Sequence, residues 1–315
     1  MKNMRFLLFV LLCIVLLACQ KDTIEIPFVI EGISTETYPK VDGSTSTEPL
    51  QTLIACKLLG CSYNWRQRFE LDGTWAIQPN YEDIPYSFFG ERIKTSQTHN
   101  SFINLIDKKA DFILSARKMS DDEKTYATNA GITLIETPVA LDAFVFIANP
   151  DNTVKSLTTK QVQDIYLGNI TNWKEVGGRD TKINPYVRNA NSGSQELMES
   201  LVMKGLDMPD WPEEVLSSMM LAFTMIRSNV NGLCYTVYYY KEQIVRDDEF
   251  VKSIAVNGVY PDKKTIKDKS YPYVAEVYAV IRSDLDKASM AYKLYELLQT
   301  EEGKNAIAES GYIPN

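Results

Sequence analysis

The stretch SLTTKQVQDIYLGNITNWKEVGG, residues 156–178, carries the clearest fold signal in the chain. Thr158 precedes an amphipathic run that reaches Tyr166, and Gly168 follows, which predicts a capped helix that ends at a glycine turn. An Asn-Trp pair comes next, at residues 172–173. This combination of helix, glycine turn and Asn-Trp is specific, so we interpret the neighbouring segments outward from it.

Apolar strands are predicted on both sides of this stretch. Residues 140–148 (ALDAFVFIA) form a continuous apolar run, as a strand buried on both faces requires. Residues 183–187 (INPYV) predict a second strand that leads into a turn at 188–195. Strands and amphipathic helices alternate along the chain, which predicts an α/β protein with doubly wound, mostly parallel sheets. Ligands of such folds bind beyond the carboxyl ends of the strands.

Length and charge narrow the class of protein. The chain has 315 residues, more than one compact core usually holds, which predicts two lobes. The formal net charge of −8 argues against nucleic-acid binding, which normally needs a basic face. It does not argue against an anion site, because such sites use local amide and hydroxyl donors.

The N-terminus resembles a bacterial lipoprotein signal peptide over residues 1–18. A basic start precedes an apolar run at 6–17, which is too short for an ordinary transmembrane helix, and a small residue stands directly before Cys19. Cleavage there would leave Cys19 as the acylated first residue, followed by a tether over residues 19–37. A plain secretory signal and a membrane anchor are the alternatives. The lipoprotein interpretation predicts an exported protein, lipid-anchored at the bacterial cell envelope, in the periplasm or on the cell surface.

The remaining cysteines and the single histidine give no metal signal. Cys56 and Cys61 lie near a predicted helix end, where they either pair in an oxidising compartment or serve as small apolar packing residues. Cys234 lies in a strand-like stretch and is expected to be buried. With His99 as the only histidine, we expect no zinc site and no cofactor.

Three turns place small hydroxyl residues where a strand ends and a helix begins, at residues 44–47, 95–101 and 192–194. A helix N-terminus presents unpaired N–H groups and a partial positive charge, and Gly193 lets the backbone approach a ligand. Arg188 adds a guanidinium that can bind an oxyanion in bidentate fashion. A single turn of this kind before a helix is far more often just an ordinary N-cap. The residues by themselves therefore predict a two-lobed α/β protein with candidate anion turns.

The same segments resemble the phosphate-binding proteins of bacterial ABC transporters, within the type II periplasmic substrate-binding protein family. The resemblance covers residues 38–315 and is carried by the opening stretch, by VRNANSGSQELME at 187–199, and by YPYVAEVYAVI at 271–281 with GYIPN at 311–315. It implies two lobes joined by two crossover strands, with lobe one comprising 38–139 and 259–315 and lobe two comprising 140–258.

The resemblance also implies a function and a set of ligand residues. The protein would be a monomeric, non-catalytic receptor that captures inorganic phosphate between the lobes and presents it to ABC permease subunits. Positions that match the family's ligand turns, or a serine-arginine pair found in other branches, are Thr45, Ser46, Thr47, Thr98, Ser115, Arg117, Arg188, Ser192, Gly193 and Ser194.

Departures from the family pattern leave the ligand open. Ala116 stands where the best-studied branch has an aspartate that accepts a proton from hydrogen phosphate, and Ala190 replaces an acid that steadies the binding arginine. Arg117 is either a substitute positive contact or a solvated side chain, and Glu48 is either a substitute acceptor or a helix N-terminal acid. Without the acceptor, discrimination between phosphate and sulfate is expected to loosen.

Alternatives of other classes remain. The ligand could be sulfate, another oxyanion or an anionic solute, or the chain could be a surface or regulatory lipoprotein that kept the fold without transport. An enzyme is a third alternative, since His99 could serve as a base, but no G-x-S-x-G elbow surrounds Ser194 or Ser46. The cluster Tyr238–Tyr240 indicates either packing at a strand end or a stacking platform for a larger ligand.

Overall fold

The computed structural model describes residues 28–68, 73–211 and 215–315. The predicted signal peptide, Cys19 and the first part of the tether lie outside these residues. The second part of the predicted tether, 28–37, packs on the body of the protein: Ile30 is buried, and Arg92 Nη2 donates to the Glu36 carbonyl at 2.8 Å. Among the described residues, no helix combines the length and apolar character that crossing a bilayer requires.

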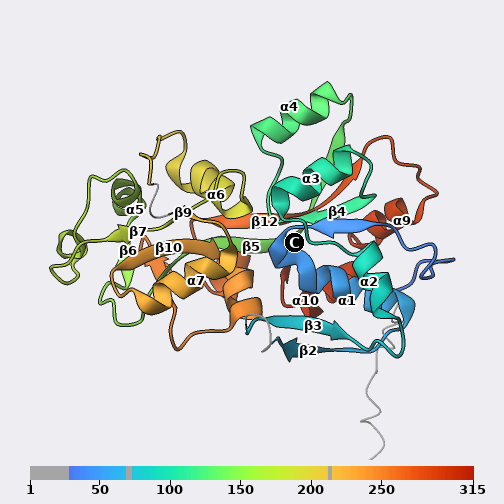
Figure 1. The fold of residues 1–315 in the computed structure, drawn as a ribbon, viewed down its shortest axis with the longest axis horizontal. Coiled ribbons are helices and arrows are strands. Elements are labelled where there is room, and N and C mark those ends of the chain that lie inside the picture. Colours follow the sequence, from blue (N-terminus) through green and yellow to red (C-terminus); the bar gives the residue numbers. More distant parts are fainter. Residues whose placement is uncertain (1–27, 69–72, 212–214) are drawn as a thin grey trace, which may run out of the picture.

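In the described part of the chain, one nine-stranded sheet runs through the whole molecule (Figure 1). Its main path is β1 (Val41–Gly43), β4 (Phe112–Ser115), β12 (Val274–Arg282), β5 (Leu134–Ala148), β10 (Gly232–Val237) and β7 (Asn184–Pro185), with β6 (Ser156–Leu157), β11 (Lys252–Val256) and β13 (Ile313–Pro314) beside it. Two small sheets pair β2 (Tyr63–Gln67) with β3 (Trp75–Pro79) and β8 (Val187–Arg188) with β9 (Val215–Leu216).

The long strand β5 connects the two ends of the sheet. Its N-terminal part pairs with β12 and β13, and its C-terminal part pairs with β10 and β11. The ten residues 139–148 are buried without interruption, because helices cover both faces of the sheet there, and this explains the continuous apolar run in the sequence. Strands β5 and β12 run antiparallel to their neighbours, whereas β1–β4, β7–β10 and β6–β11 are parallel. The α/β fold class is confirmed, with a mixed rather than mostly parallel sheet.

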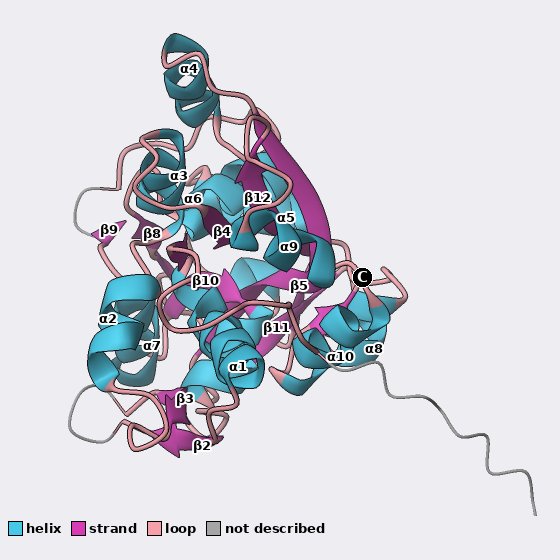
Figure 2. Ribbon diagram, turned by 90° about the vertical axis from the view of Figure 1, so that its right-hand side faces the viewer, coloured by secondary structure: helices cyan, strands magenta, loops and turns pink. Residues whose placement is uncertain are grey.

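Helices lie on both sides of the strands (Figure 2). The α-helices are α1 (Glu48–Leu59), α2 (Tyr86–Arg92), α3 (Thr98–Ile106), α4 (Asp121–Asn129), α5 (Thr159–Tyr166), α6 (Gly193–Leu197), α7 (Met219–Ser228), α8 (Lys263–Lys267), α9 (Met290–Leu297) and α10 (Glu301–Glu309). The described residues also form the 3₁₀ turns η1 (Thr45–Thr47) and η2 (Trp173–Val176) and the π-helical segments η3 (Met198–Met203) and η4 (Tyr240–Val245).

We call the elements at one end of β5 lobe one and those at the other end lobe two. Lobe one contains β1–β4, η1, α1–α4, β12, α9, α10 and β13; lobe two contains β6–β11, α5–α7 and η2–η4 (Figure 1). Helix α8 packs against β5. These groups follow from strand pairing and helix packing.

Residues 156–178 fold as predicted at the start of this segment. Thr158 caps α5, its side chain accepting the Gln161 N–H while Gln161 bonds back to Thr158 N, and Gly168 adopts a left-handed φ of 77° just beyond the helix. Trp173 is 1% exposed, and its indole N–H donates to the Asn231 carbonyl at 3.0 Å. This segment is thus a capped helix followed by a turn that one buried indole anchors.

One predicted strand is wrong in detail. Residues 183–187 do not form a single strand, because Asn184–Pro185 pair with β10 whereas Val187–Arg188 pair with β9 in a separate sheet. Pro185 has no N–H to continue a ladder, and Tyr186 lies between the two pairings. The change of partner turns Arg188 away from the main sheet and toward the space between the lobes.

Candidate functional site

The three predicted hydroxyl turns and Arg188 meet at one cavity of about 270 Å³. Both lobes contribute to its wall: η1 and the start of α3 from lobe one, and the starts of α6 and α7 and the end of β10 from lobe two. The lining residues are Ser44, Thr45, Ser46, Gln97, Thr98, Ala116, Arg188, Ser192, Gly193, Ser194, Leu197, Ser218, Met219, Met220, Val237 and Tyr240.

Hydrogen bonds join the first two turns. The Ser44 and Thr98 hydroxyls lie 2.8 Å apart, and Ser44 Oγ also accepts the Ala116 N–H at 2.9 Å. The Ser46 carbonyl accepts the Tyr312 hydroxyl at 3.0 Å. These bonds fix the first turn against the ends of β1 and β4, so that its donors need little rearrangement to face a ligand.

The second turn contains a strained residue. Gln97, directly before α3, has φ 71°, a left-handed value that side chains other than glycine rarely adopt. Such strain is of order 1–3 kcal/mol and is concentrated at functional sites. At the first helical position, Thr98 is 5% exposed and faces the cavity. The backbone therefore directs the N-terminus of α3, with its partial positive charge, at the cavity.

Arg188 is the positively charged group of the cavity wall. It is 7% exposed; its Nε donates to the Leu216 carbonyl at 3.0 Å, and its N–H donates to the Tyr235 hydroxyl at 2.9 Å. Within residues 28–68, 73–211 and 215–315, no carboxylate forms an ion pair with it. Burial lowers the pKa of Arg188 from its ordinary value. A buried guanidinium without a protein anion is an arrangement that favours an anionic ligand.

The third turn begins α6 and touches the second turn. Ser192 caps α6 by accepting the Gln195 N–H at 3.1 Å, so the capping interpretation of this serine holds beside any ligand role. A Cβ on Gly193 would lie 2.5 Å from Thr98 Oγ1, closer than real Cβ atoms approach. Gly193 is therefore needed for the contact between the lobes at this point.

The structure does not bring Thr47, Ser115 and Arg117 to the cavity. The Thr47 hydroxyl donates to the Ser44 carbonyl at 2.8 Å, and the Ser115 hydroxyl donates to the Arg117 carbonyl at 2.6 Å. The Arg117 guanidinium makes a bidentate ion pair with Glu123, with both distances 2.8 Å. The hydrogen bonds and the ion pair of these three side chains are made within lobe one, and none of the three residues lines the cavity.

Glu48, the candidate substitute acceptor, and His99, the candidate base, do not line the cavity. Glu48 pairs with Arg68 Nη1 at 3.0 Å, and His99 Nδ1 lies 3.0 Å from Glu123 Oε1. No aspartate or glutamate is among the described residues that line the cavity. Ala116 lines it, as expected for the position that replaces the family's aspartate. The lining is therefore rich in donors and lacks a carboxylate acceptor.

Several lining residues escaped the sequence analysis as ligand candidates. Ser44 and Gln97 belong to the predicted turns, and only their geometry distinguishes them. Ser218 caps α7 by accepting the Leu221 N–H at 3.3 Å, and the pattern of a serine before an apolar helix start was available as a signal. Met219 and Met220 follow it and give one side of the cavity an apolar surface.

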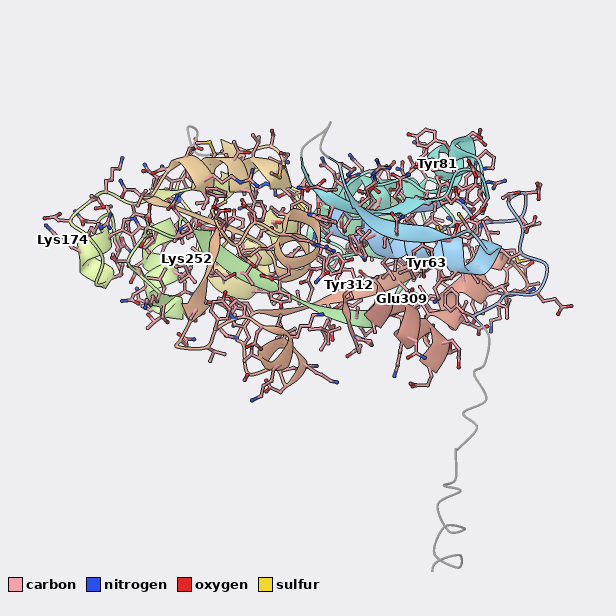
Figure 3. All side chains as sticks on the ribbon, turned by 90° about the horizontal axis from the view of Figure 1, so that it is seen from below. Tyr63, Tyr81, Lys174, Lys252, Glu309 and Tyr312 are labelled. Carbon is pink, nitrogen blue, oxygen red and sulfur yellow. The ribbon has the colours of Figure 1, made fainter. Side chains whose placement is uncertain are left out.

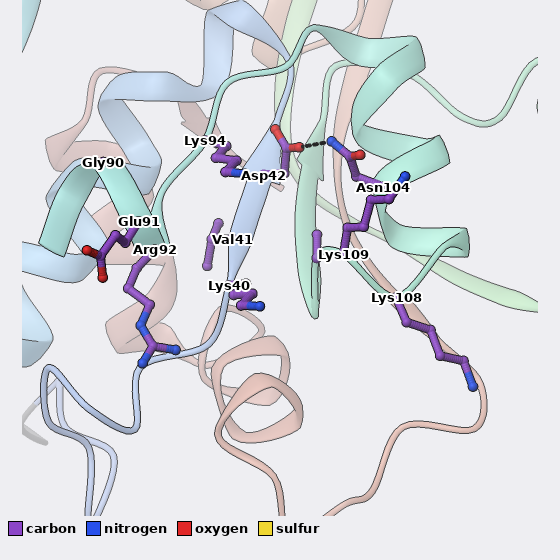
Figure 4. A pocket seen from close by; sticks show the side chains of 11 residues that line it. Lys40, Val41, Asp42, Gly90, Glu91, Arg92, Lys94, Asn104, Lys108 and Lys109 are labelled. Carbon is purple, nitrogen blue, oxygen red and sulfur yellow. Dashed lines mark hydrogen bonds between the residues drawn. The ribbon is translucent and has the colours of Figure 1, made fainter. Parts of the chain in front are cut away.

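A larger groove, of about 760 Å³, lies on lobe one beside β1, away from this cavity (Figure 4). Asp42 lies in it, buried, and accepts from Asn104 Nδ2 at 2.7 Å. Lys109 pairs with Asp107 at 2.8 Å, and Lys108 lies 3.5 Å from Asp284. The basic residues that line the groove are Lys40, Arg92, Lys94, Lys108 and Lys109. Because all four lysines are solvent-exposed, we place the candidate site in the smaller cavity.

Comparisons with known proteins agree with this fold. A family model described as a PBP superfamily domain matches residues 34–300. The phosphate-binding protein PstS of Staphylococcus epidermidis is 31% identical over 223 residues, which cover 69% of this chain and 67% of that protein. The chain belongs to this family of substrate-binding proteins. The PstS protein of Bacillus subtilis is 26% identical over 182 residues, or 58% of each chain.

Solved structures of the family share the fold. A Clostridium perfringens protein assigned as a phosphate ABC transporter substrate-binding protein, solved with bound phosphate, superposes with a TM-score of 0.64 at 23% identity. An ABC-type phosphate transport receptor from Vibrio cholerae gives a TM-score of 0.61, also at 23% identity. Each comparison covers 87% of this chain and 98% of the other. The predicted family and fold are thus confirmed.

Three of the cysteines lie among the described residues. Cys56, Cys61 and Cys234 are free and buried, which supports the packing interpretation of the first two. Burial raises the pKa of Cys234 to about 12, so its thiol stays protonated. No group of three or more histidine, cysteine or acidic residues in the described ranges could hold a metal ion.

Proposed function

We propose that this protein captures inorganic phosphate between its two lobes and delivers it to an ABC-type importer. The observation that carries the proposal is the buried Arg188, which lacks a carboxylate partner and faces hydroxyl turns from both lobes across one cavity. The names of the family members, phosphate-binding proteins and phosphate transport receptors, support phosphate as the ligand. The proposed ligand residues are Thr45, Ser46, Thr98, Arg188, Ser192, Gly193 and Ser194.

The physical basis is replacement of the ion's hydration shell. An oxyanion that leaves water needs a donor for each oxygen, because a buried charge without partners is strongly unfavourable. Hydroxyls, backbone N–H groups at helix N-termini and one guanidinium supply such donors with little reorganisation. Since these donors come from both lobes, binding favours the closed arrangement.

The lobe boundaries follow as part of this proposal. Lobe one comprises 38–139 and 259–315, and lobe two comprises 140–258, so that β5 and β12 form the crossovers. Pairing of β5 with β12 at one end and with β10 at the other supports the division. The contact between Gly193 and Thr98 marks the place where the lobes meet.

The absence of a carboxylate from the described lining affects ligand choice. A carboxylate that accepts a proton from hydrogen phosphate repels fully ionised sulfate, and this cavity lacks that filter. Sulfate, another oxyanion or a small anionic solute is therefore the alternative ligand. Met219 and Met220 would lie beside the organic part of such a solute.

The cellular setting remains a proposal built on the sequence. Cleavage before Cys19 and acylation of that residue would hold the protein at the cell envelope, where it acts as a monomer on permease subunits. The receptor role is non-catalytic, and a regulatory lipoprotein without transport is the alternative.

A phosphatase or esterase assay on purified protein tests the enzyme alternative, and sustained turnover would contradict the receptor role.

A parallel thermal titration with phosphate and sulfate tests the ligand. A ligand at one hundred times its Kd stabilises the native state by about 2.7 kcal/mol, which raises the melting temperature measurably. We expect saturable stabilisation by phosphate and weaker but detectable stabilisation by sulfate. No shift with phosphate at millimolar concentration would remove phosphate as the ligand, and a larger shift with sulfate would favour the alternative.

A further inference from the structure

The π-helix η4 connects the cavity to a contact between the lobes. Its first residue, Tyr240, lines the cavity, and the residue after its last turn is Arg246. The Arg246 guanidinium carbon lies 4.7 Å from the ring centre of Trp65 and 4.6 Å from that of Trp75. Both distances fall within the range of cation–π attraction, so two tryptophans hold one cation.

The two tryptophans belong to the β2–β3 hairpin of lobe one. Trp65 lies opposite Ile77, and Trp75 lies opposite Gln67, so the two indoles are diagonal neighbours on one face of the hairpin. The cation that lies over both rings is the guanidinium of Arg246, which follows η4 of lobe two. The contact therefore joins elements that are far apart in the sequence and lie in different lobes.

The hairpin is firmly attached to lobe one. Ile77 packs in a buried cluster with Leu53 of α1 and Ala306 of α10, and Trp65 packs against the same cluster. Tyr63 at the start of β2 donates its hydroxyl to Glu309 at the end of α10, and the two side chains lie side by side in Figure 3. The tryptophans thus move with lobe one as a unit.

The helix η4 is attached to lobe two at its start and after its end. It follows β10 directly, and Lys241 forms an ion pair with Asp248 in the segment that leads to β11. At the crossover, the Tyr239 N–H donates to Asp142 at 2.9 Å, and the Tyr239 ring stacks on Tyr312 with centroids 3.5 Å apart. This stacking lies at the crossover, whereas Arg246 lies beyond it along η4.

We propose that Arg246 is a positioning residue that clasps lobe two to the β2–β3 hairpin, holds Tyr240 in the cavity wall and slows release of the bound ligand. When the lobes separate, the guanidinium has to leave both indoles, because it belongs to one lobe and they belong to the other. The inference rests on the proposed interlobe ligand site. It assigns a role in the kinetics of closure to residues that do not touch the ligand.

The expected change in the equilibrium between closed and open forms depends on how exposed the cation–π contacts of Arg246 are to solvent. Arg246 keeps access to solvent and the indoles are half-buried, so each cation–π contact is of the moderate kind. Two such contacts correspond to a change of about fivefold to thirtyfold in the equilibrium between closed and open forms. The dissociation rate of the ligand should change by about that factor, with a small effect on association.

The test compares Arg246→Ala with wild-type full-length protein. Arg246 has φ 53°, so alanine, which also carries a Cβ, keeps the backbone strain of the position unchanged, whereas glycine would relieve it. Arg66→Ala is the matched control, because Arg66 lies on the same hairpin, is exposed and forms no ion pair among the described residues. Arg246→Lys keeps the charge and removes the flat guanidinium, and should give an intermediate result.

Two readouts are measured: the dissociation rate of inorganic phosphate by stopped flow, and the radius of gyration without phosphate by small-angle scattering. Arg246→Ala should release phosphate about fivefold to thirtyfold faster, or show a larger radius of gyration than wild type, while Arg66→Ala matches wild type. If both readouts of Arg246→Ala equal wild type, or if Arg66→Ala changes equally, the clasp is overturned. If the wild-type protein does not bind phosphate, the proposed function is wrong. The radius of gyration of Arg246→Ala relative to wild type then still tests the proposed clasp.

Discussion

At the scale of single residues, Arg188 determines what the cavity can hold. Its guanidinium is buried, its Nε is bound to the Leu216 carbonyl, and no described acid neutralises it. An anion in the cavity would supply the missing counter-charge. This is why the same residue should matter greatly for binding and only modestly for folding.

Arg188→Ala should weaken phosphate binding by at least about 30-fold, because truncating one partner of a buried, hydrogen-bonded charge pair costs about 2 kcal/mol or more. Isothermal titration calorimetry measures the affinity, and urea unfolding without ligand measures stability. Arg227→Ala, which removes an arginine from α7 in the same lobe, is the control and should bind normally. An unchanged affinity of Arg188→Ala would remove this residue from the site.

Gly193 makes the contact with Thr98 possible. Gly193→Ala places a Cβ 2.5 Å from Thr98 Oγ1, so the lobes cannot close fully, and phosphate affinity should fall about tenfold or more while α6 remains folded. Thr98→Ala removes the clashing atom, and the remaining Thr98 Cβ distance is 3.4 Å. The double variant should therefore lose less affinity than the sum of the two single losses, as measured by a double-mutant cycle. Strict additivity would contradict the clash.

Ala116 lines the cavity at the position where the proposed discrimination between phosphate and sulfate can be tested. Ala116→Asp adds a carboxylate to a lining that has none, and an ionised carboxylate repels sulfate but accepts the proton of hydrogen phosphate. Sulfate affinity should fall about tenfold or more relative to phosphate affinity, in parallel calorimetric titrations. An equal loss for both anions would show that position 116 does not face the ligand.

Sequence adjacency could not decide which hydroxyl of a turn faces the ligand. Ser46 and Thr47 are neighbours, yet Ser46 lines the cavity and the Thr47 hydroxyl bonds to the Ser44 carbonyl. Arg117 and Ala116 differ in the same way, because Glu123, six residues further along, draws the guanidinium inward. The sequence therefore predicted the turns and Arg188, whereas the orientation of each side chain required the hydrogen-bond partners.

At the scale of secondary-structure elements, strand β5 carries a buried acid at the crossover. Asp142 is 2% exposed; its Oδ1 accepts the N–H groups of Tyr239 and Ala143, and its Oδ2 has no hydrogen-bond partner. Burial raises the pKa of Asp142 to about 7, although the N–H groups of Tyr239 and Ala143 oppose the shift. The protonated form is thus favoured in the folded protein below about pH 7.

A raised pKa has a definite sign for stability. The stabilisation from protonated Asp142 is complete below the ordinary pKa of 3.8 and is lost as the pH rises through about 7. Asp142→Asn cannot ionise, so its stability relative to wild type should grow by up to about 4 kcal/mol between about pH 4 and pH 8. Urea unfolding across this range is the measurement. Parallel curves for the two proteins would show that Asp142 is not desolvated in the folded state.

Elements with strong periodicity were predictable, and those set by tertiary contacts were not. The helix at 159–166 followed from its capping residue and amphipathic pattern. The strand predicted at 183–187 is divided because its two halves pair with different strands. The local sequence does not indicate which strand each half pairs with. The π-helical shape of η4 also depends on its surroundings, since Tyr239 stacks on Tyr312 from the opposite end of the chain.

At the scale of the whole molecule, the family resemblance supplied what local patterns could not. Residue patterns predicted an α/β fold with two lobes, and the resemblance implied two crossover strands, but the pairing of the C-terminal strand β12 with β5 at the centre of the sheet is a finding of the structure. Strands β12 and β13 thus lie beside the N-terminal part of β5, and the cavity is lined by elements from both ends of the sheet. The position of the cavity is therefore a property of the complete chain path.

The central claim is that this cavity encloses a tetrahedral anion. The most direct measurement is a crystal structure of protein purified under gentle conditions and crystallised with phosphate. The account predicts a four-cornered ion bound by Arg188 and by hydroxyls from both lobes, including Thr98 and Ser192. An empty cavity at saturating phosphate, or an ion found only in the basic groove beside β1, would contradict it.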